Sequence, residues 1–292
     1  SGRLAADLLP ALDEQNLPQR YCILERSADL RAVQKTCLAE RAPQLLERIH
    51  WLDRPPAKEW RGVLIANEIL DALAVERFEV TEHGIEQLCI DHDGDSFCWA
   101  KRPAPPDLRA AVDLLVPDGV SALEHFGKDY RSEINPQLAA WLDAVTASMN
   151  QGLALIIDYG YPRSEYYLPE RRDGTLMCHY RHHAHDNVFF HPGLQDITAW
   201  VDFTALAEAA DKAGLEVEGY CSQVMFLLGC GLDQVLPELI DASGDQGVAL
   251  QAEARQLTLP GMMGERFQVM GRGRGLSEPL RGFSFQDLRH RL

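Results

Sequence analysis

Short apolar runs alternate with segments of helical periodicity along most of the chain. RYCILERS (20–27), GVLIANE (62–68) and LALIIDYGY (153–161) are typical of buried strands, and a further strand in LLERIHWLDRPP is closed by prolines. After the first of them, ADLRAVQKTCLAER has apolar positions at helical spacing. Buried strands that alternate with helices favour parallel pairing, so the sequence predicts an α/β fold on a mostly parallel, doubly wound sheet.

The two ends of the chain have the same character. RLAADLLPAL predicts a helix over residues 3–12, and DFTALAEAADKAGLEVEGY predicts a helix that ends near Gly214 and is followed by a strand. GERFQVMGRGRG is typical of a last strand, and we interpret GRGRG as the turn that follows it. Because Ser1-Gly2 leads directly into the first helix without Met, we expect a segment upstream to be absent from this sequence.

Two stretches interrupt the alternation. Residues 75–100 alternate with period two across turn signals at His83-Gly84 and Asp93-Gly94, which predicts inserted antiparallel strands. Residues 160–200 are rich in His, Tyr, Arg and Pro and predict either a binding lid or a disordered loop. We therefore expect one domain, 1–292, with insertions at about 75–120 and 160–200.

Composition limits the classes of binding partner and the cellular location that we expect. The 292 residues carry a net charge of −16, which disfavours a nucleic-acid or anionic-membrane surface and favours a basic substrate. The seven cysteines are scattered and never form CxxC, so we expect reduced thiols and a cytoplasmic location. No run approaches the roughly 18 to 20 apolar residues of a membrane span, and the first residues lack a signal-peptide pattern.

Candidate chemistry begins at the first strand and helix. If Gly2 ends a glycine-rich turn, a ligand can approach the backbone there, and Glu25 follows 23 positions later at a strand end, where a carboxylate binds ribose hydroxyls. A nicotinamide-dependent oxidoreductase would share this half-motif. Equally, Gly2 can be a plain terminus and Glu25 a solvated acid.

Acids and amides also mark the ends of two later strands, at Asn67-Glu68 and Asp158-Tyr159-Gly160. Ligands of doubly wound sheets bind at such ends. If EILDALAV continues as a helical turn, Glu68 and Asp71 share one face and suit a guanidinium cation. The alternative is an acid pair favoured by the helix dipole.

The histidine-rich stretch offers a competing chemistry. Its donors are sufficient for a zinc or iron site, although no HExxH signature is present and we expect no metal. These donors are Cys178, His179, His182, His183, His185, Asp186 and His191.

Six segments together resemble the MidA-like S-adenosylmethionine-dependent methyltransferases, a family that contains a protein-arginine methyltransferase. They are YCILERSADLRAVQ, ANEILDALAVERF, IIDYGYPRSEYY, GTLMCHYRHHAHD, PGLQDITAWVDFTAL and MGERFQV. The resemblance implies a Rossmann-like class I methyltransferase that uses S-adenosyl-L-methionine. It also implies that SGRLAADLL is the tail of the glycine motif, whose strand is missing here.

The resemblance further implies a role for individual residues. The cofactor side would comprise Gly2, Glu25, Ser27, Leu52, Asp53 and Asn67. A guanidinium is a poor nucleophile, and a carboxylate can orient it; the catalytic candidates are therefore Glu68, with Asp71 and Asp158 in support. The substrate side would comprise Tyr159, Gly160, Asp196, Thr198 and Asp202.

Several of these positions have a structural alternative. Tyr159-Gly160 can be a simple strand-to-loop turn, and Asp202 suits the N-cap of the helix that follows it. Trp200 stands where His is more usual in the family, so no acid–base role is expected there.

Three functions remain open at this point. The first is a methyltransferase that acts on arginine in a basic protein. The second is a methyltransferase-like module that binds a protein partner without catalysis. The third is a nicotinamide-dependent oxidoreductase.

Overall fold

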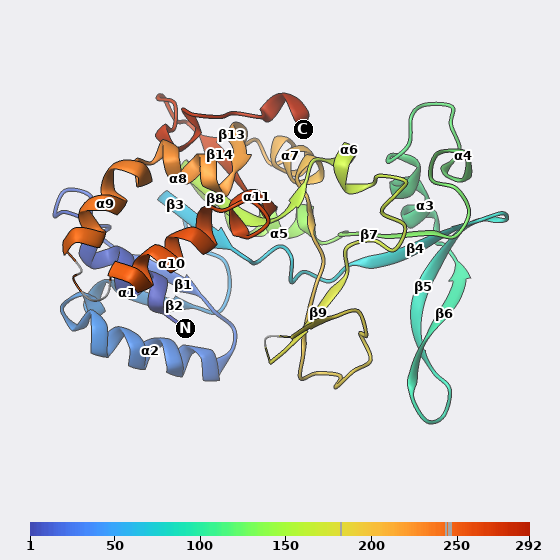
Figure 1. Cartoon of the computed structure of the whole chain (residues 1–292), viewed down its shortest axis with the longest axis horizontal. Helices are drawn as coiled ribbons and strands as arrows, with labels where there is room; N and C mark the ends of the chain where they lie inside the picture. Colours follow the sequence, from blue (N-terminus) through green and yellow to red (C-terminus); the bar gives the residue numbers. More distant parts are fainter. Residues whose placement is uncertain (182, 243, 245–246) are drawn as a thin grey trace. The chain divides into compact units, whose positions relative to one another are not determined.

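The computed structural model describes residues 1–181, 183–242, 244 and 247–292 (Figure 1). Two compact units are present, Ser1–Trp60 and Arg61–Leu292, and each is described by itself. The single domain expected over the whole chain stays a prediction.

The first unit is a two-stranded parallel sheet covered by helices. Cross-strand pairs run from Tyr21↔Ile49 to Leu24↔Leu52, so both strands end at the same edge. The Ser27 hydroxyl accepts from Leu30 N at 3.3 Å and caps the second helix. The predicted strands and helices of this region are confirmed. Its elements are α1 (Arg3–Ala11), β1 (Tyr21–Leu24), α2 (Ala28–Arg41), η1 (Pro43–Arg48) and β2 (Ile49–Leu52).

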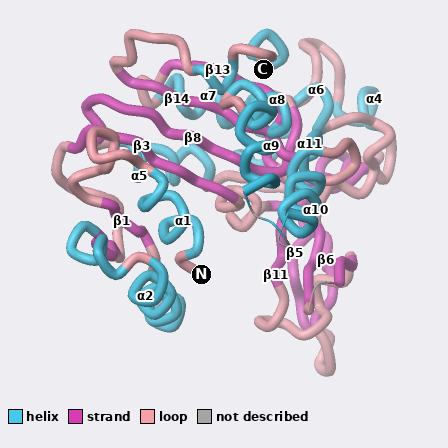
Figure 2. The backbone as a smooth tube through the Cα atoms, turned by 60° about the vertical axis from the view of Figure 1, so that its left-hand side comes forward, coloured by secondary structure: helices cyan, strands magenta, loops and turns pink. Residues whose placement is uncertain are grey.

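A five-stranded sheet forms the centre of the second unit (Figure 2). Its strands are β3 (Trp60–Asn67), β8 (Met149–Tyr161), β12 (Val201–Asp202), β13 (Glu216–Ser222) and β14 (Phe267–Arg274). β8 is central, because it pairs with β14 on one side and with β3 and β12 on the other. The backbone of Gly62 lies against Gly152, and Glu68 N donates to Ile157 O, so β3 runs parallel to β8.

The sheet is mixed rather than mostly parallel. β14 is antiparallel to both β8 and β13. Its GRGRG segment is part of the strand, and our interpretation of it as a turn was wrong. The glycines allow close packing: a Cβ on Gly273 would lie 2.0 Å from Glu218 Oε1. The fully buried Arg272 donates to Ala207 O at 2.5 Å, so this strand ties a helix to the sheet.

Helices cover both faces of this sheet. The helices of the second unit are α3 (Pro106–Asp113), α4 (Ala122–Phe126), α5 (Leu138–Thr146), α6 (Arg163–Tyr166), α7 (Phe203–Lys212), α8 (Gln223–Gly229), α9 (Leu232–Ala242), α10 (Gly247–Thr258), α11 (Met263–Arg266), η3 (Arg281–Phe283) and η4 (Arg289–Arg291). Arg272 faces α7, whereas Val269 packs with Phe226 and Phe283 of α8 and η3.

The predicted antiparallel insertion is confirmed and is larger than expected. β4 (Glu76–Thr81), β5 (Gly84–His92), β6 (Phe97–Pro103) and β7 (Tyr130–Ile134) form an antiparallel sheet in the order β6-β5-β4-β7. The β5–β6 hairpin extends away from the five-stranded sheet (Figure 1). Phe78, Phe126 and Tyr130 form a core between this sheet and α3 and α4.

The segment 160–200 is folded and is not an open loop, and its role as a binding lid stays a prediction. β9 (Met177–Tyr180), β10 (His183–His185) and β11 (Asp196–Thr198) form a small antiparallel sheet in the order β10-β9-β11. The Trp99 and Phe189 rings, 5.4 Å apart, place this segment beside the β5–β6 hairpin.

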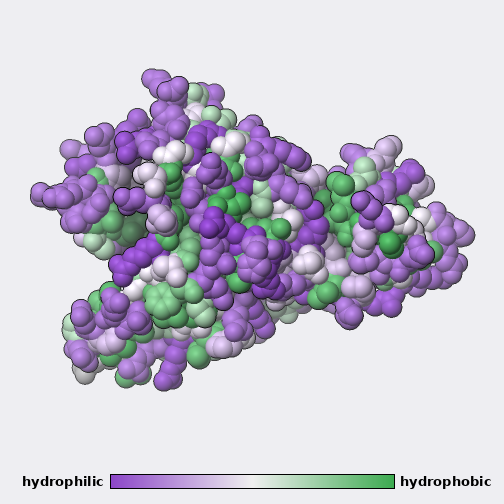
Figure 3. Space-filling model, turned by 90° about the horizontal axis from the view of Figure 1, so that it is seen from above, coloured by the Kyte–Doolittle hydropathy of each residue, from purple (hydrophilic) through white to green (hydrophobic). Residues whose placement is uncertain are grey.

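Apolar side chains reach the surface in separate patches among hydrophilic residues, as the view from above shows (Figure 3). Within the described ranges no single helix is long and apolar enough to cross a membrane. α8 and α9 pass that test only together, across an 80° bend.

Candidate active site

The cofactor candidates of the first unit gather at one edge of its sheet. Glu25 follows β1 and Asp53 follows β2, and Glu25 N donates to Leu52 O at 3.0 Å. The two carboxylates therefore project from adjacent parallel strand tips. This is the edge at which ligands of α/β sheets bind.

Glu25 is held in place by its neighbours. Its Oε1 accepts from Ser27 N at 2.9 Å, and its Oε2 accepts from the side-chain amide of Gln34 at 3.1 Å. Gln34 in turn accepts from Trp51 Nε1. Each carboxylate oxygen keeps a lone pair for a further donor, so the arrangement fits a ribose hydroxyl pair.

Gly2 occupies the N-cap of α1 in the left-handed region, with φ 80°. A Cβ there would lie 3.2 Å from the Gln34 backbone, so the close approach of the two helices favours glycine. Gly2, Ser27 and Glu25 are thus linked through Gln34 and its neighbours. The role of Gly2 in a glycine-rich cofactor turn stays a prediction.

In the second unit, Asn67 and Glu68 lie exposed at the tip of β3, where Asn67 Nδ2 donates to Glu68 Oε1 at 3.1 Å. EILDALAV does not continue as a helical turn, so the condition for Glu68 and Asp71 to share one helix face is not met. Glu68 is left-handed, with φ 51°, and the chain bends through Asp71 instead. Helix-dipole stabilisation of the two acids is therefore also excluded.

The bend is organised by Asp158. This carboxylate is fully buried, and its Oδ2 accepts from the backbone N–H groups of Ile69, Leu70 and Asp71 at 3.2, 2.9 and 3.3 Å. Its Oδ1 accepts from Tyr159 N at 2.9 Å. Asp158 lies inside β8 rather than after it, because β8 continues to Tyr161 through its pairing with β12.

Asp71 and Asp158 form a buried acid pair. Burial raises the pKa of Asp158 to about 7, and the charge of Asp71 contributes to this rise. Burial and the nearby Glu68 raise the pKa of Asp71 to about 6. One Asp71 oxygen, Oδ1, is buried and has no hydrogen-bond partner in the structure. Near neutral pH the pair can therefore retain a proton next to Glu68.

Tyr159 and Gly160 have different surroundings. The Tyr159 ring lies 4.0 Å from that of Phe267, and both line a hollow of about 380 Å³ with Met262, Met263 and Arg266. Burial and then the Glu68 charge raise the pKa of Tyr159 to about 12, so it remains a neutral phenol. Gly160 packs against the Val201 carbonyl and faces the interior.

Asp196 and Thr198 belong to β11. Asp196 is exposed opposite His179, and Thr198 pairs with Met177. The residue after Thr198 links β11 to the bend at Glu68–Asp71, because Ala199 N donates to Asp71 O at 3.0 Å. Thr198 directly precedes Ala199, so this bond brings the end of β11 to Asp71.

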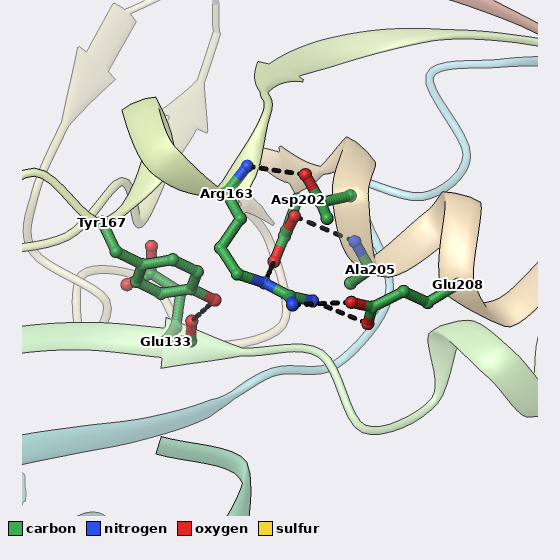
Figure 4. A network of polar contacts seen from close by, with 7 residues as sticks. Glu133, Arg163, Tyr167, Asp202, Ala205 and Glu208 are labelled. Carbon is green, nitrogen blue, oxygen red and sulfur yellow. Dashed lines mark hydrogen bonds and ion pairs between the residues drawn. The ribbon is translucent and has the colours of Figure 1, made fainter. Parts of the chain in front are cut away.

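Asp202 is already engaged by protein groups (Figure 4). Its Oδ1 accepts from Ala205 N and caps α7, and its Oδ2 pairs with Arg163 Nε at 3.2 Å. The Arg163 guanidinium also forms two bonds to Glu208 at 2.7 and 2.8 Å. The N-cap alternative is therefore confirmed for Asp202, and little capacity is left for a substrate.

Sequence reasoning missed Arg163 and Ala199. Arg163 is within the IIDYGYPRSEYY segment, but nothing in its spacing indicates a pairing with Asp202 about forty positions later. Ala199 acts through its backbone N–H, which any residue other than proline would supply. Neither contact leaves a signal in the residue type.

The histidine-rich segment gives no metal site among the residues that the structure describes: no three His, Cys, Asp or Glu side chains are grouped to hold an ion. His182, one of the candidate donors, lies outside the described residues. The remaining donors are spread over β9, β10 and the connection to β11.

An α/β fold with acids at the tips of parallel strands is typical of enzymes that bind a nucleoside cofactor. The chain belongs to the family described as "Putative S-adenosyl-L-methionine-dependent methyltransferase", whose model matches residues 1–221. The resemblance stated from the sequence is confirmed. The match favours a methyltransferase over a nicotinamide-dependent oxidoreductase.

Curated relatives of the chain include mitochondrial protein arginine methyltransferases named NDUFAF7. The protein from Rattus norvegicus is 31% identical over 210 residues, which are 70% of this chain and 44% of the relative. That from Mus musculus is 27% identical over 91% of this chain and 63% of the relative. The chain therefore spans about half the length of the curated relatives it matches.

Solved structures match more completely. A COG1565 superfamily protein from Burkholderia thailandensis, crystallised with S-adenosyl-homocysteine, is 37% identical with a TM-score of 0.91. The alignment covers 100% of this chain and 73% of that protein. A native structure from the same organism gives a TM-score of 0.90 and the same identity.

Proposed function

We propose that this chain is the catalytic part of a protein-arginine N-methyltransferase that uses S-adenosyl-L-methionine and acts in the cytoplasm on a basic protein. The observation that carries the proposal is Glu68, an exposed carboxylate fixed at the tip of β3 beside a buried acid pair. The names of the relatives and the family match support it, as does the net charge of −16. The scattered cysteines support a reducing compartment.

In the first unit the cofactor would be held through Glu25 on its ribose and Asp53 near its adenine, with Gly2, Ser27 and Leu52 as the other predicted contacts. When bound, S-adenosyl-L-methionine supplies an electrophilic methyl group on a sulfonium sulfur. Glu68 would bind and orient the guanidinium, drawing positive charge away from the nitrogen that attacks. Transfer releases one proton from that nitrogen, and Asp71, whose Oδ1 has no hydrogen-bond partner in the structure, is a nearby group able to accept it.

The alternative is a silent module that binds its partner without catalysis. Isothermal titration of the full-length protein with S-adenosyl-homocysteine, followed by transfer of labelled methyl groups to cell extract, separates the two. The proposal expects binding and transfer, and expects label to be recovered in methylarginine. Binding without any transfer would establish the silent module.

Glu68→Gln tests the assigned residue. It should lower turnover at least about 100-fold, as loss of a transition-state contact does, and leave cofactor affinity within a few-fold. Asp143→Asn, an exposed change on α5, is the matched control and should leave turnover unchanged. Normal turnover in Glu68→Gln would refute the assignment.

A further inference from the structure

Glu68 is held in a conformation that its own side chain disfavours. Its φ of 51° lies in the left-handed region, where the Cβ comes too close to the following carbonyl oxygen. On its N-terminal side, Glu68 N donates to Ile157 O at 3.0 Å and continues the β3–β8 pairing. The turn that follows must therefore be fixed by other contacts.

Asp158 provides those contacts. Its Oδ2 collects three successive N–H groups, from Ile69 to Asp71, at 2.9 to 3.3 Å. Successive amides that point to one centre form a concavity suited to an anion, and here the anion is part of the protein. Leu70 is 1% exposed, so its amide would have no water to replace this acceptor.

The far end of the turn is fastened independently. Ala199 N donates to the Asp71 carbonyl at 3.0 Å, which links the turn to the segment after β11. The backbone carrying Glu68 is thus held by β8 before the bend, by Asp158 within it and by Ala199 after it.

We propose that Asp158 is a positioning residue that sets the conformation of Glu68 and makes no contact with the methyl acceptor. Its side chain is 0% exposed, and both of its oxygens already accept backbone N–H groups. This inference rests on the proposed function, since it assigns Asp158 a role through Glu68. It replaces the direct catalytic role expected from the sequence.

The first test does not depend on activity. In Asp158→Asn, hydrogen exchange of the amides of Ile69, Leu70 and Asp71 should rise at least about 10-fold, because loss of the charged acceptor weakens three bonds. Asp143→Asn should leave their exchange unchanged. Unaltered exchange in Asp158→Asn would overturn the proposal, whether or not the protein transfers methyl groups. If this variant does not fold, Asp158→Ser takes its place.

The second test is a double-mutant cycle with Glu68→Gln. Asp158→Asn alone should lower kcat at least about 10-fold and change KM less than about 3-fold, since a misplaced group impairs the chemical step. In the Glu68→Gln background the same change should lower the residual rate by less than about 2-fold, because its target is already absent. Equal losses in both backgrounds would show that Asp158 acts directly and would refute the positioning role. Absence of methyl transfer in the wild-type protein would refute the proposed function instead, and the exchange result would still decide whether Asp158 fixes the turn.

Discussion

The carbonyl oxygen of Val201 lies 2.1 Å from the point that a β-carbon on Gly160 would occupy. Such a separation is far below van der Waals contact, so a side chain at position 160 would displace β12 from β8. Gly160 follows Asp158 and Tyr159 in the same strand. The close contact therefore fixes β12, which leads to α7, beside the strand that carries Asp158 and Tyr159.

Gly160→Ala should destabilise the protein by about 1 to 3 kcal/mol, the usual cost of overpacking an interior. Denaturant unfolding measures this loss. Gly94→Ala, in an open hairpin turn with no atom within 4 Å of the added carbon, is the comparison, although its φ of 105° also carries strain. A smaller loss for Gly160→Ala than for Gly94→Ala would contradict the packing argument.

The order of apolar and polar residues was enough to predict which strand tips carry acids, but not the backbone conformation of those tips. The switch from Ile65 to Asn67-Glu68 is visible as a change from apolar to polar residues. The residues that follow, EILDALAV, also suit a helical turn by their local propensity. Asp158 overrides that propensity from 87 to 89 positions away, and a contact of that separation has no local signature.

The segment GRGRG is a second case in which the sequence interpretation was wrong, because a predicted turn belongs to a strand. Glycine and arginine usually indicate a solvated turn, so the sequence placed these residues after the last strand. In the structure the glycines allow Phe283 and Glu218 to approach β14, and the buried Arg272 bonds a helix carbonyl. Tertiary packing decides the conformation here, and a single sequence contains no record of the neighbours.

Glu25→Ala should weaken binding of S-adenosyl-homocysteine by about 1.5 to 3 kcal/mol, the value of hydrogen bonds to a charged group. Glu25→Gln retains an acceptor for Ser27 N and should cost less. Isothermal titration measures both, with the exposed Asp29→Ala as a control on the same unit. Equal affinity of all three variants would remove Glu25 from the cofactor site.

Asp202→Asn separates a structural role from substrate binding. Asparagine caps a helix as well as aspartate does, but it cannot pair ionically with Arg163, so unfolding should become easier by about 1 to 3 kcal/mol. Glu208→Gln, at a half-exposed partner of the same arginine, should cost about 0 to 1 kcal/mol. The KM for the methyl acceptor should stay within about two-fold in both. A selective rise in KM for Asp202→Asn would restore the substrate-binding interpretation.

The raised pKa of Asp71 makes the stability of the protein depend on pH. Its pKa rises from the ordinary value of 3.8 to about 6 in the folded protein, so between these values the folded state binds more protons than the unfolded state. Stability from this group is therefore greatest below about pH 4 and falls as pH rises to about 6. The cause is the buried carboxylate, which must ionise near Glu68.

Asp71→Asn removes that ionisation and should flatten the profile. Between pH 4 and pH 8 the free energy of unfolding of the variant should rise by up to about 3 kcal/mol relative to that of the wild type, because each pKa unit corresponds to about 1.4 kcal/mol. Urea unfolding of both proteins at the two pH values measures the difference. Groups that do not interact with Asp71 cancel in the comparison, and Asp158, whose pKa the Asp71 charge raises, adds to the gain. Asp143→Asn should show no such change with pH. A stability difference between Asp71→Asn and the wild type that is the same at both pH values would show that Asp71 titrates normally, and Asp158 alone of the pair would then have a raised pKa.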